Sequence, residues 1–345
     1  MSDTTITSRP ADAHASSGVG IRLEGVTKVY PGQSVPAVDA FSMQVEPGEL
    51  IMFVGPSGCG KTTTMKMINR IIEPTSGTIS IDDRDVLSLN PNELRRHIGY
   101  VIQQIGLFPH MTIGENIAVV PKLLGWSKKR TADRVEELLE TVQLSGEFAA
   151  RYPRQLSGGQ QQRVGVARAL AADPPVMLMD EPFGATDPIT RERLQAEFLR
   201  LQESIGKTII FVTHDFDEAI RLGDRIAVLS ERSRIEQFDT PAAILAAPAN
   251  DYVRSFIGHG AALKRLALIS VADAPLGPVT DAGAVPVSIT DNLRDALDLL
   301  VLNGSPAVTV VDRDGRPVGS LTMERISAAL GVEVDGLSTH PGGER

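Results

Sequence analysis

Short apolar runs separated by turn residues and helical segments recur through the first two thirds of the chain. Leu50–Val54 is one such run, and it leads into a glycine-rich loop and a helical segment over about residues 61–71. Residues 176–179 and 208–212 are further runs flanked by helical segments, as is typical of strands buried in a parallel sheet. Residues 226–229 predict one more strand. Repeated strand–helix alternation predicts an α/β core with a mostly parallel sheet.

Two other parts of this region have patterns of their own. From residue 21 to about residue 81, short β-type runs alternate with turn residues, which predicts several short strands. Residues 131–144 carry Val135, Leu138 and Val142 at helical spacing, with charged side chains on the opposite face. We expect an amphipathic helix there.

The composition changes after about Gly258. Residues 261–286 mix Ala, Pro, Gly and Asp, which is typical of a connector with room for one helix. Residues 287–330 then predict the order β-α-β-β-α, a small second unit. The expected divisions are a flexible tail over 1–19, a large domain over 20–258, a connector over 259–285, a small unit over 286–331 and a tail over 332–345.

The bulk composition narrows the class of protein. A length of 345 residues favours one large domain plus a small one. Hydrophobic residues at 42% and charged residues at 22% argue against wholesale disorder. A formal net charge of −9 disfavours non-specific binding to nucleic acid or to anionic membranes. One cysteine, Cys59, permits no internal disulfide and fits a reducing cytoplasm.

Membrane and secretion signals are not evident in the sequence. No stretch approaches the about 18 consecutive apolar residues that a membrane-spanning helix needs. Residues 1–20 are rich in Ser, Thr, Ala and Asp, without a basic segment followed by an apolar run, so we do not expect a secretory signal. If the protein works at a membrane, other subunits must hold it there.

The glycine-rich loop fits the phosphate-binding pattern G-x-x-x-x-G-K-[ST] in full. Its residues are Gly55, Pro56, Ser57, Gly58, Cys59, Gly60, Lys61 and Thr62. The glycines let backbone N–H groups point at phosphate oxygens, and the helix that follows adds the positive end of its dipole. Lys61 can reach the β- and γ-phosphates, and the Thr62 hydroxyl can bind Mg²⁺. The loop therefore predicts binding of a nucleotide with Mg²⁺.

A second motif follows about a hundred residues later. Ser157, Gly158, Gly159 and Gln160 precede Gln-Gln-Arg; the serine is a good helix N-cap, and the glycines expose backbone N–H groups. The segment resembles the signature motif of the ABC ATPases. The resemblance implies that these four residues contact the γ-phosphate held by the phosphate loop of a second subunit. One chain then carries two half-sites and works as a head-to-tail homodimer.

Two carboxylates end a predicted strand. Asp180 and Glu181 follow the apolar run at 176–179, and the carboxyl ends of such strands form the ligand-binding edge of α/β sheets. The segment resembles the Walker B strand of the same family, which implies that Asp180 binds Mg²⁺ and Glu181 orients or deprotonates the attacking water. His214, after the run at 208–212, resembles the switch histidine that contacts the γ-phosphate and helps to position that water.

Three further positions match nucleotide-binding residues of the family. Gln103 resembles the Q-loop glutamine, which binds Mg²⁺ and water and links them to the membrane subunit; it directly follows the apolar pair Val101–Ile102, which favours it over Gln104. Tyr30 stands where the family places an aromatic ring under adenine, although a tyrosine packed on the core would also fit there. Thr63, beside Thr62, is a further expected ATP contact.

Asp187 lies in a segment that resembles the family's D-loop, Gly-Ala-Thr-Asp over residues 184–187. The family usually has Leu where this chain has Thr186. The difference bears on packing at the dimer interface and leaves the assignment of Asp187 unaffected.

The resemblance covers about residues 21–257. It implies a P-loop NTPase core of the ABC ATPase type, with an antiparallel β subdomain and a helical subdomain at about residues 104–173. A separate ATPase chain with a C-terminal accessory unit favours an importer. Residues 98–117 and 180–191 are close to the ATPases of glycine betaine, carnitine and choline importers. This implies quaternary-amine osmoprotectants as cargo, membrane permease subunits as partners, indirect cooperation with an extracytoplasmic solute-binding protein, and a peripheral location on the cytoplasmic face of the membrane.

The small unit over residues 286–331 resembles a single CBS motif, for which a regulatory role and a dimer-stabilising role both remain open. Three other functions also remain. They are an ABC ATPase for another solute such as an amino acid, polyamine or phosphonate, a non-transport ABC ATPase acting on nucleic acid or ribosomes, and a regulator that binds nucleotide without hydrolysis. The acidic composition and single ATPase domain argue against a nucleic-acid partner, and Glu181 argues against a non-hydrolysing regulator.

Overall fold

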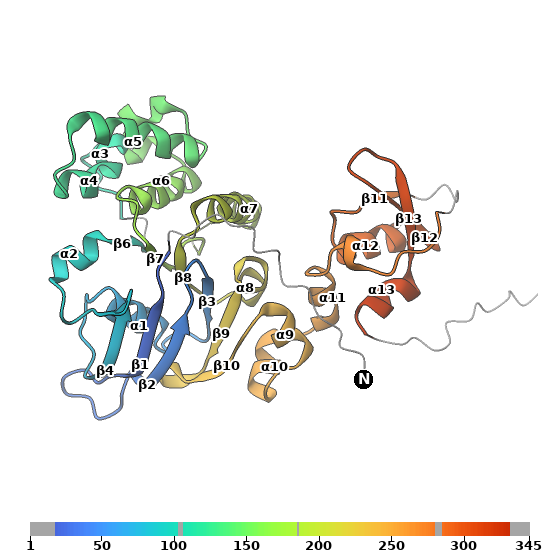
Figure 1. The fold of residues 1–345 in the computed structure, drawn as a ribbon, viewed down its shortest axis with the longest axis horizontal. Helices are drawn as coiled ribbons and strands as arrows, with labels where there is room; N and C mark the ends of the chain where they lie inside the picture. The colour runs from blue at the N-terminus through green and yellow to red at the C-terminus, as the bar shows by residue number, and fades with distance from the viewer. Residues whose placement is uncertain (1–17, 103–105, 185, 280–284, 332–345) are drawn as a thin grey trace, which may run out of the picture. The chain divides into compact units, whose positions relative to one another are not determined.

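The computed structural model describes residues 18–102, 106–184, 186–279 and 285–331 (Figure 1). The chain forms two compact units, Met1–Pro241 and Ala242–Arg345. The division therefore falls before the expected boundary at residue 258, because apolar periodicity and motifs mark helices and strands but not where one compact unit ends. Within the described ranges, no helix is both long and apolar enough to span a membrane.

A six-stranded sheet forms the centre of the first unit, in the order β10-β9-β3-β8-β7-β6. The strands are β3 (Leu50–Val54), β6 (Ile98–Val101), β7 (Val176–Asp180), β8 (Thr208–Thr213), β9 (Arg225–Leu229) and β10 (Ile235–Asp239). All neighbours pair in parallel except β9 and β10. Every residue of β3, β7 and β8 is buried, which explains their uninterrupted apolar runs. The mostly parallel sheet predicted from the sequence is confirmed.

An antiparallel sheet, ordered β2-β1-β4-β5, lies beside the central sheet. Its strands are β1 (Ile21–Lys28), β2 (Val38–Val45), β4 (Ser76–Ile81) and β5 (Arg84–Asp85). Apolar side chains from β1, β2 and β4 share one core with α1 (Lys61–Ile68) and with one face of the parallel sheet. The Phe41 and Phe53 rings meet edge to face within this core, with centroids 5.9 Å apart. The phosphate loop is thus attached to a rigid support.

Most of the remaining helices of this unit form a separate group, seen above the sheets in Figure 1. The group contains α3 (Ile113–Ile117), α4 (Val119–Leu123), α5 (Lys128–Thr141) and α6 (Gly158–Leu170), with short 3-10 turns at Gly146–Ala150 and Pro153–Gln155. Helix α2 (Pro91–Arg96) precedes β6. The α5 helix begins earlier than the predicted residue 131, because the Ser127 hydroxyl accepts from Arg130 N and starts the helix in a polar first turn.

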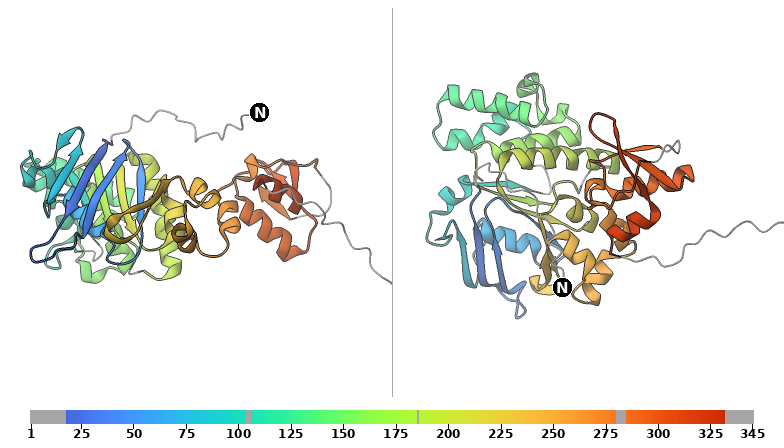
Figure 2. Two further views of the ribbon diagram at one scale, coloured as in Figure 1. Left: turned by 90° about the horizontal axis from the view of Figure 1, so that it is seen from below. Right: turned by 45° about the vertical axis from the view of Figure 1, so that its right-hand side comes forward.

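Helices α7 (Pro188–Ile205) and α8 (Phe216–Leu222) follow β7 and β8. The rings of Phe183, Phe198 and Phe211 pack against one another, with centroids 5.7–6.1 Å apart. Phe198 lies on α7 and Phe211 on β8, so this cluster attaches α7 to the sheet. Figure 2 shows the two helices beside the strands from a second direction.

The second unit has a core of its own. Its elements are α9 (Pro241–Ala246), which begins at the division, then α10 (Asp251–Ile257), α11 (Ala261–Leu266), a 3-10 turn (Val271–Asp273), β11 (Pro286–Ser288), α12 (Leu293–Asn303), β12 (Ala307–Val311), β13 (Pro317–Thr322) and α13 (Met323–Ala329). The sheet order is β11-β12-β13, parallel and then antiparallel. The predicted β-α-β-β-α order is therefore confirmed.

The segment expected as a connector over residues 259–285 is folded in its described part. Leu266 and Val271 belong to the same core as Val287 and Leu321. The Val271 N–H also donates to the Asp291 carbonyl at 2.8 Å. The expectation of a connector is corrected here, because a few apolar side chains spaced among Ala, Pro and Gly are enough to attach the segment to the core.

Candidate functional site

The phosphate loop joins the end of β3 to the start of α1. Gly58 and Gly60 have φ values of 80° and 111°, a region that side chains other than glycine rarely adopt. A Cβ atom on Gly60 would also overlap the Ser233 hydroxyl. The loop therefore needs glycine at residue 60 for both conformation and space.

Lys61 lies inside the curve of this loop. Its side chain is buried, and its Nζ donates to the Gly55 carbonyl at 2.7 Å and the Pro56 carbonyl at 2.9 Å. The Cys59 Sγ lies 3.7 Å from the same Nζ and is also buried. The ammonium is thus held at the centre of the loop, where a β- or γ-phosphate would meet it.

Ser233 supports the loop from outside, and no sequence motif predicts this contact. Its backbone N–H donates to the Cys59 carbonyl at 2.6 Å, and its hydroxyl donates to the same oxygen at 3.1 Å. Ser233 and Arg232 both have a φ of 59°. The one available signal was its position shortly after the strand predicted at residues 226–229, which does not indicate contact with a phosphate loop.

Thr62 and Asp180 meet at the carboxyl edge of the sheet. Val54 pairs with Thr213, and Val212 pairs with Asp180, so β3, β8 and β7 end at the same level. The Thr62 hydroxyl donates to Asp180 Oδ1 at 3.0 Å. Burial raises the pKa of Asp180, and the neighbouring Glu181 adds to this effect. A hydroxyl and a carboxylate beside a phosphate loop are hard oxygen ligands and fit Mg²⁺.

Glu181 and His214, the two predicted catalytic residues, lie next to each other. His214 Nδ1 is 3.4 Å from Glu181 Oε2, and the His214 side chain is 60% exposed. Glu181 has a φ of 45°, and its N–H donates to the Val212 carbonyl at 3.0 Å. A positive φ is strained in a residue other than glycine, and such strain is concentrated at functional sites.

The segment after Glu181 leads into α7 through a hydrogen-bonded turn. The Thr186 hydroxyl donates to the Phe183 carbonyl at 2.7 Å, and Arg191 Nη2 donates to the Thr186 carbonyl at 3.1 Å. Asp187 is the N-cap of α7 and accepts from Thr190 N at 3.0 Å, which lowers the pKa of the Asp187 carboxyl. The departure at Thr186 therefore supplies a hydrogen bond within the turn.

The signature segment starts helix α6. The Ser157 hydroxyl accepts from Gln160 N at 3.3 Å, and the Gln160 side chain accepts from Ser157 N at 2.9 Å, so the two form a capping box. Ser157 and Gly158 are exposed. Among the described residues, no hydrogen bond or ion pair joins the signature segment to the phosphate loop, and Figure 1 shows α6 apart from α1. The structure does not bring these two predicted half-sites together within one chain.

Three predicted positions remain. Tyr30 is half-buried after β1, with Lys28 Nζ 5.5 Å from its ring centroid. Thr63 lies half-buried in the first turn of α1. Gln103 and the adjacent Gln104 lie outside the described residues.

Comparison with known proteins agrees with this geometry. Residues 38–184 match the ABC transporter family. The osmoprotectant import ATP-binding protein OsmV of Salmonella typhimurium is 50% identical, over 93% of this chain and 83% of its own. The glycine betaine/carnitine/choline transport ATP-binding protein OpuCA of Bacillus subtilis is 51% identical, over 89% of this chain and 79% of its own. A dimeric structure of the ATP-binding cassette MJ0796 bound to ADP and Pi is 36% identical, covers 64% of this chain and 98% of its own, and has a TM-score of 0.57.

Proposed function

The chain belongs to the ATP-binding proteins of ABC transporters, and from this premise we propose that it energises an importer of quaternary-amine osmoprotectants such as glycine betaine, choline or carnitine. The main support for the proposal is the 50% sequence identity with an osmoprotectant import ATP-binding protein over 93% of the chain. An alignment of that extent necessarily includes part of the C-terminal unit and therefore goes beyond the ATPase core. The cargo itself binds to other subunits, so the proposal rests on relationship and not on a solute site in this chain.

ABC ATP-binding proteins hydrolyse ATP, and the site suggests a role for each residue. Lys61 and the loop N–H groups hold the β- and γ-phosphates, and Tyr30 stacks on adenine. Thr62 and Asp180, together with Gln103, hold Mg²⁺, which when bound neutralises phosphate charge. The hydrogen bond between Thr62 and Asp180 supports this assignment.

Glu181 and His214 act on the attacking water. The Glu181 carboxylate accepts a proton from the water or orients it, and the adjacent imidazole holds the γ-phosphate and the carboxylate in place. Their separation of 3.4 Å supports a shared role. Because His214 is largely exposed, a second subunit can approach this edge of the sheet.

The signature segment completes the site of a second copy. Ser157 and Gly158 are exposed at the N-terminus of α6, and such a helix start suits the γ-phosphate bound to the partner's loop. A head-to-tail homodimer then holds two ATP molecules, each between one phosphate loop and the opposite signature segment. The capping box around Ser157 supports this role by fixing the direction of the helix.

A groove on the helical group is the proposed contact with the permease. Helices α3, α4 and α5 line an open groove of about 700 Å³ that includes Trp126, Val135 and Leu139. Leu123 and Phe108 are exposed, at 57% and 41%. A permease helix docked here would hold the protein at the cytoplasmic face of the membrane, with an extracytoplasmic solute-binding protein acting on the other side.

Solute uptake tests the proposal. Cells lacking the gene would be given labelled glycine betaine, choline or an unrelated amino acid. We expect loss of quaternary-amine uptake that the wild-type gene restores and a Lys61→Ala gene does not. Unchanged quaternary-amine uptake with loss of another solute would discard the cargo and keep the ATPase. Normal uptake of all solutes would contradict the importer role.

A further inference from the structure

The two helices that carry the signature segment and the D-loop run side by side from their N-termini. Ser157 caps α6, and Asp187 caps α7. The helices come close at Gly159, where an added Cβ would lie 3.2 Å from Thr190 Cγ2. A change in spacing between α6 and α7 therefore moves one interface segment relative to the other.

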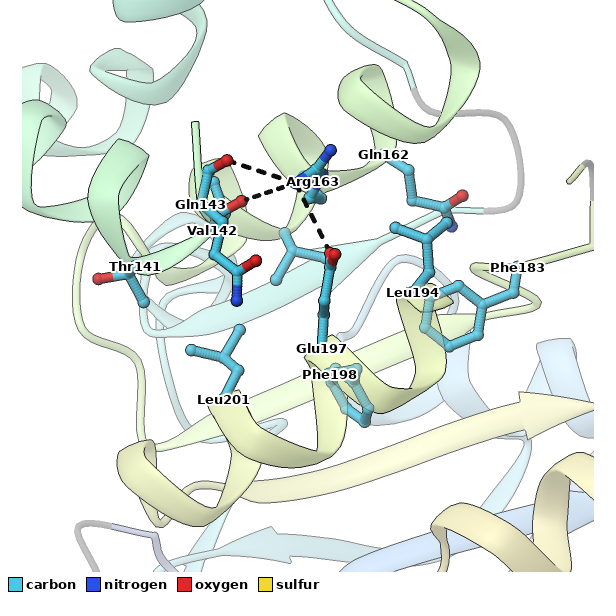
Figure 3. Close-up of a pocket in the computed structure, with 11 residues that line it drawn as sticks. Thr141, Val142, Gln143, Gln162, Arg163, Phe183, Leu194, Glu197, Phe198 and Leu201 are labelled. Atoms are coloured by element: carbon cyan, nitrogen blue, oxygen red, sulfur yellow. Dashed lines mark hydrogen bonds and ion pairs between the residues drawn. The ribbon is translucent and has the colours of Figure 1, made fainter. Parts of the chain in front are cut away.

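One turn further along α6, Arg163 connects three helices. Its Nη1 lies 3.7 Å from Glu197 Oε2 on α7, and 3.5 Å and 3.4 Å from the Val142 and Gln143 carbonyls at the end of α5 (Figure 3). The Arg163 and Glu197 side chains are only 18% and 15% exposed. Glu197 Oε1 also lies 3.9 Å from Nε of the largely exposed Arg193. Arg163 and Glu197 thus form a polar contact between the signature helix and the D-loop helix.

Not every polar atom of this ion pair has a hydrogen-bond partner. Within the described residues, Arg163 Nε and Glu197 Oε2 have no hydrogen-bond partner. A cavity of about 40 Å³ lies beside them, lined among others by Gln162, Phe183 and Leu194. A half-buried ion pair stabilises a fold well only at hydrogen-bonding distance. The ion pair, at 3.7 Å, therefore becomes stronger if α6 moves closer to α7 and shortens it.

We propose that Arg163 and Glu197 are positioning residues that set the spacing of α6 and α7, and through it the closure of the signature segment onto nucleotide. Neither side chain needs to touch ATP. Arg163 acts through the rigid helix that begins at Ser157, and Glu197 through the helix that begins at Asp187. The inference rests on the proposed function in one respect, since the ATP concerned is held by a second copy of the chain.

ATP-dependent dimerisation of full-length protein tests this proposal. In a Glu181→Gln background, which prevents hydrolysis, light scattering would measure the dimer dissociation constant with Mg·ATP. We expect Glu197→Gln or Arg163→Gln to weaken the dimer about tenfold, a change within the range for coupled contacting residues. The double variant should be little weaker than either single one. Glu192→Gln, which removes a charge from an exposed position of the same helix, is the matched control and should have no effect.

Two further readouts separate positioning from general loss of structure. Binding of a fluorescent ATP analogue to the monomer should be unchanged, because the phosphate loop lies on other elements. With Glu181 intact, the ATPase rate of Glu197→Gln should need about tenfold more protein to reach the wild-type value, in line with the expected change in dimer affinity. The rate per mole of total protein should still reach the wild-type value at high concentration, whereas a simple loss of folded protein would lower that limiting value.

The outcomes distinguish this inference from the proposed function. If the Glu181→Gln protein forms no dimer with ATP, the proposed head-to-tail mechanism is wrong. If it dimerises and Glu197→Gln dimerises equally well, only the positioning role is wrong. If Arg163→Gln does not fold, Arg163→Lys keeps the charge but cannot reach Glu197 and both α5 carbonyls together, and a dimer as tight as the parent would overturn the proposal.

Discussion

Glu181 combines a catalytic side chain with an unfavourable backbone. Its φ of 45° lies in the left-handed region, which costs a residue other than glycine about 1–2 kcal/mol. Glycine would remove that cost but would also remove the carboxylate. The backbone bends there because the Glu181 N–H continues the ladder to Val212 while the side chain turns toward His214. Strain and function therefore lie in the same residue.

Replacing Glu181 tests whether its positive φ is strained. We expect the free energy of unfolding of Glu181→Gly to be about 1 kcal/mol higher than that of Glu181→Ala, because only glycine adopts the positive φ without strain. The glycine variant is then the more stable of the two. Neither variant should hydrolyse ATP. Urea unfolding at one temperature measures the difference. Equal stabilities would show that the positive φ carries no strain.

Glu218 allows a test of how the burial of one carboxyl makes stability depend on pH. It is 6% exposed on α8 and accepts from Gln195 Nε2 at 2.8 Å, and burial raises its pKa above the usual range. A carboxyl whose pKa is raised in the folded state favours folding while protonated, and that contribution is lost as pH rises through the folded pKa.

Glu218→Gln should therefore gain stability relative to the wild type as pH rises. At a pH below the usual pKa of glutamate, the two proteins differ only by the amide, whereas near neutrality the wild type alone must bury a charge. Chemical unfolding across acidic to neutral pH gives the comparison. A stability difference that stays constant with pH would contradict the raised pKa.

The proposed dimer interface depends on the N-terminus of helix α6. Ser157 both caps α6 and faces the exposed side where a second copy is expected. We expect Ser157→Ala to lower the free energy of unfolding by about 1 kcal/mol, the usual loss of an N-cap. Ser157→Thr keeps the cap and should lose less stability. Thermal unfolding distinguishes the two, and equal losses would mean that the capping hydrogen bond contributes nothing.

Individual helices and strands could be predicted from the sequence where the pattern of buried apolar residues alone determines them. Leu50–Val54 was predicted as a strand and is β3 with the same bounds, because five consecutive buried residues leave no other pattern. The helix predicted at residues 131–144 is α5 at Lys128–Thr141, shifted because apolar spacing does not detect a polar first turn. Thr62 and Asp180 were each predicted from a motif as Mg²⁺ ligands, and their side chains are hydrogen-bonded to each other.

Contacts between elements were not predictable in the same way. Arg163–Glu197 and Ser233–Cys59 join residues far apart in sequence that belong to no shared motif. Only the packing of α6 against α7, or of the β9–β10 turn against the phosphate loop, creates them. The role of Gln103 stays a prediction.

The two units differ in what they contain. All described site residues precede Pro241, and the C-terminal core begins at Leu266. A chain ending after Gly258 should therefore bind a fluorescent ATP analogue as tightly as the full-length protein. Circular dichroism would confirm that it is folded. Lost binding by a folded truncated chain would show that the C-terminal unit contributes to the nucleotide site.

The same truncation examines the role of the CBS-like unit in cells. If the unit is regulatory, uptake by the truncated protein should lose its response to external osmolarity while importer assembly persists. Lost assembly with unchanged regulation would contradict the regulatory role and favour a dimer-stabilising one.

The ion pair between Arg163 and Glu197 has a consequence for the effect of salt. The two side chains are only 18% and 15% exposed, and dissolved ions screen a partly buried pair much less than a pair on the surface. The difference in dimer affinity between the parent and Glu197→Gln should therefore persist when the ionic strength is raised.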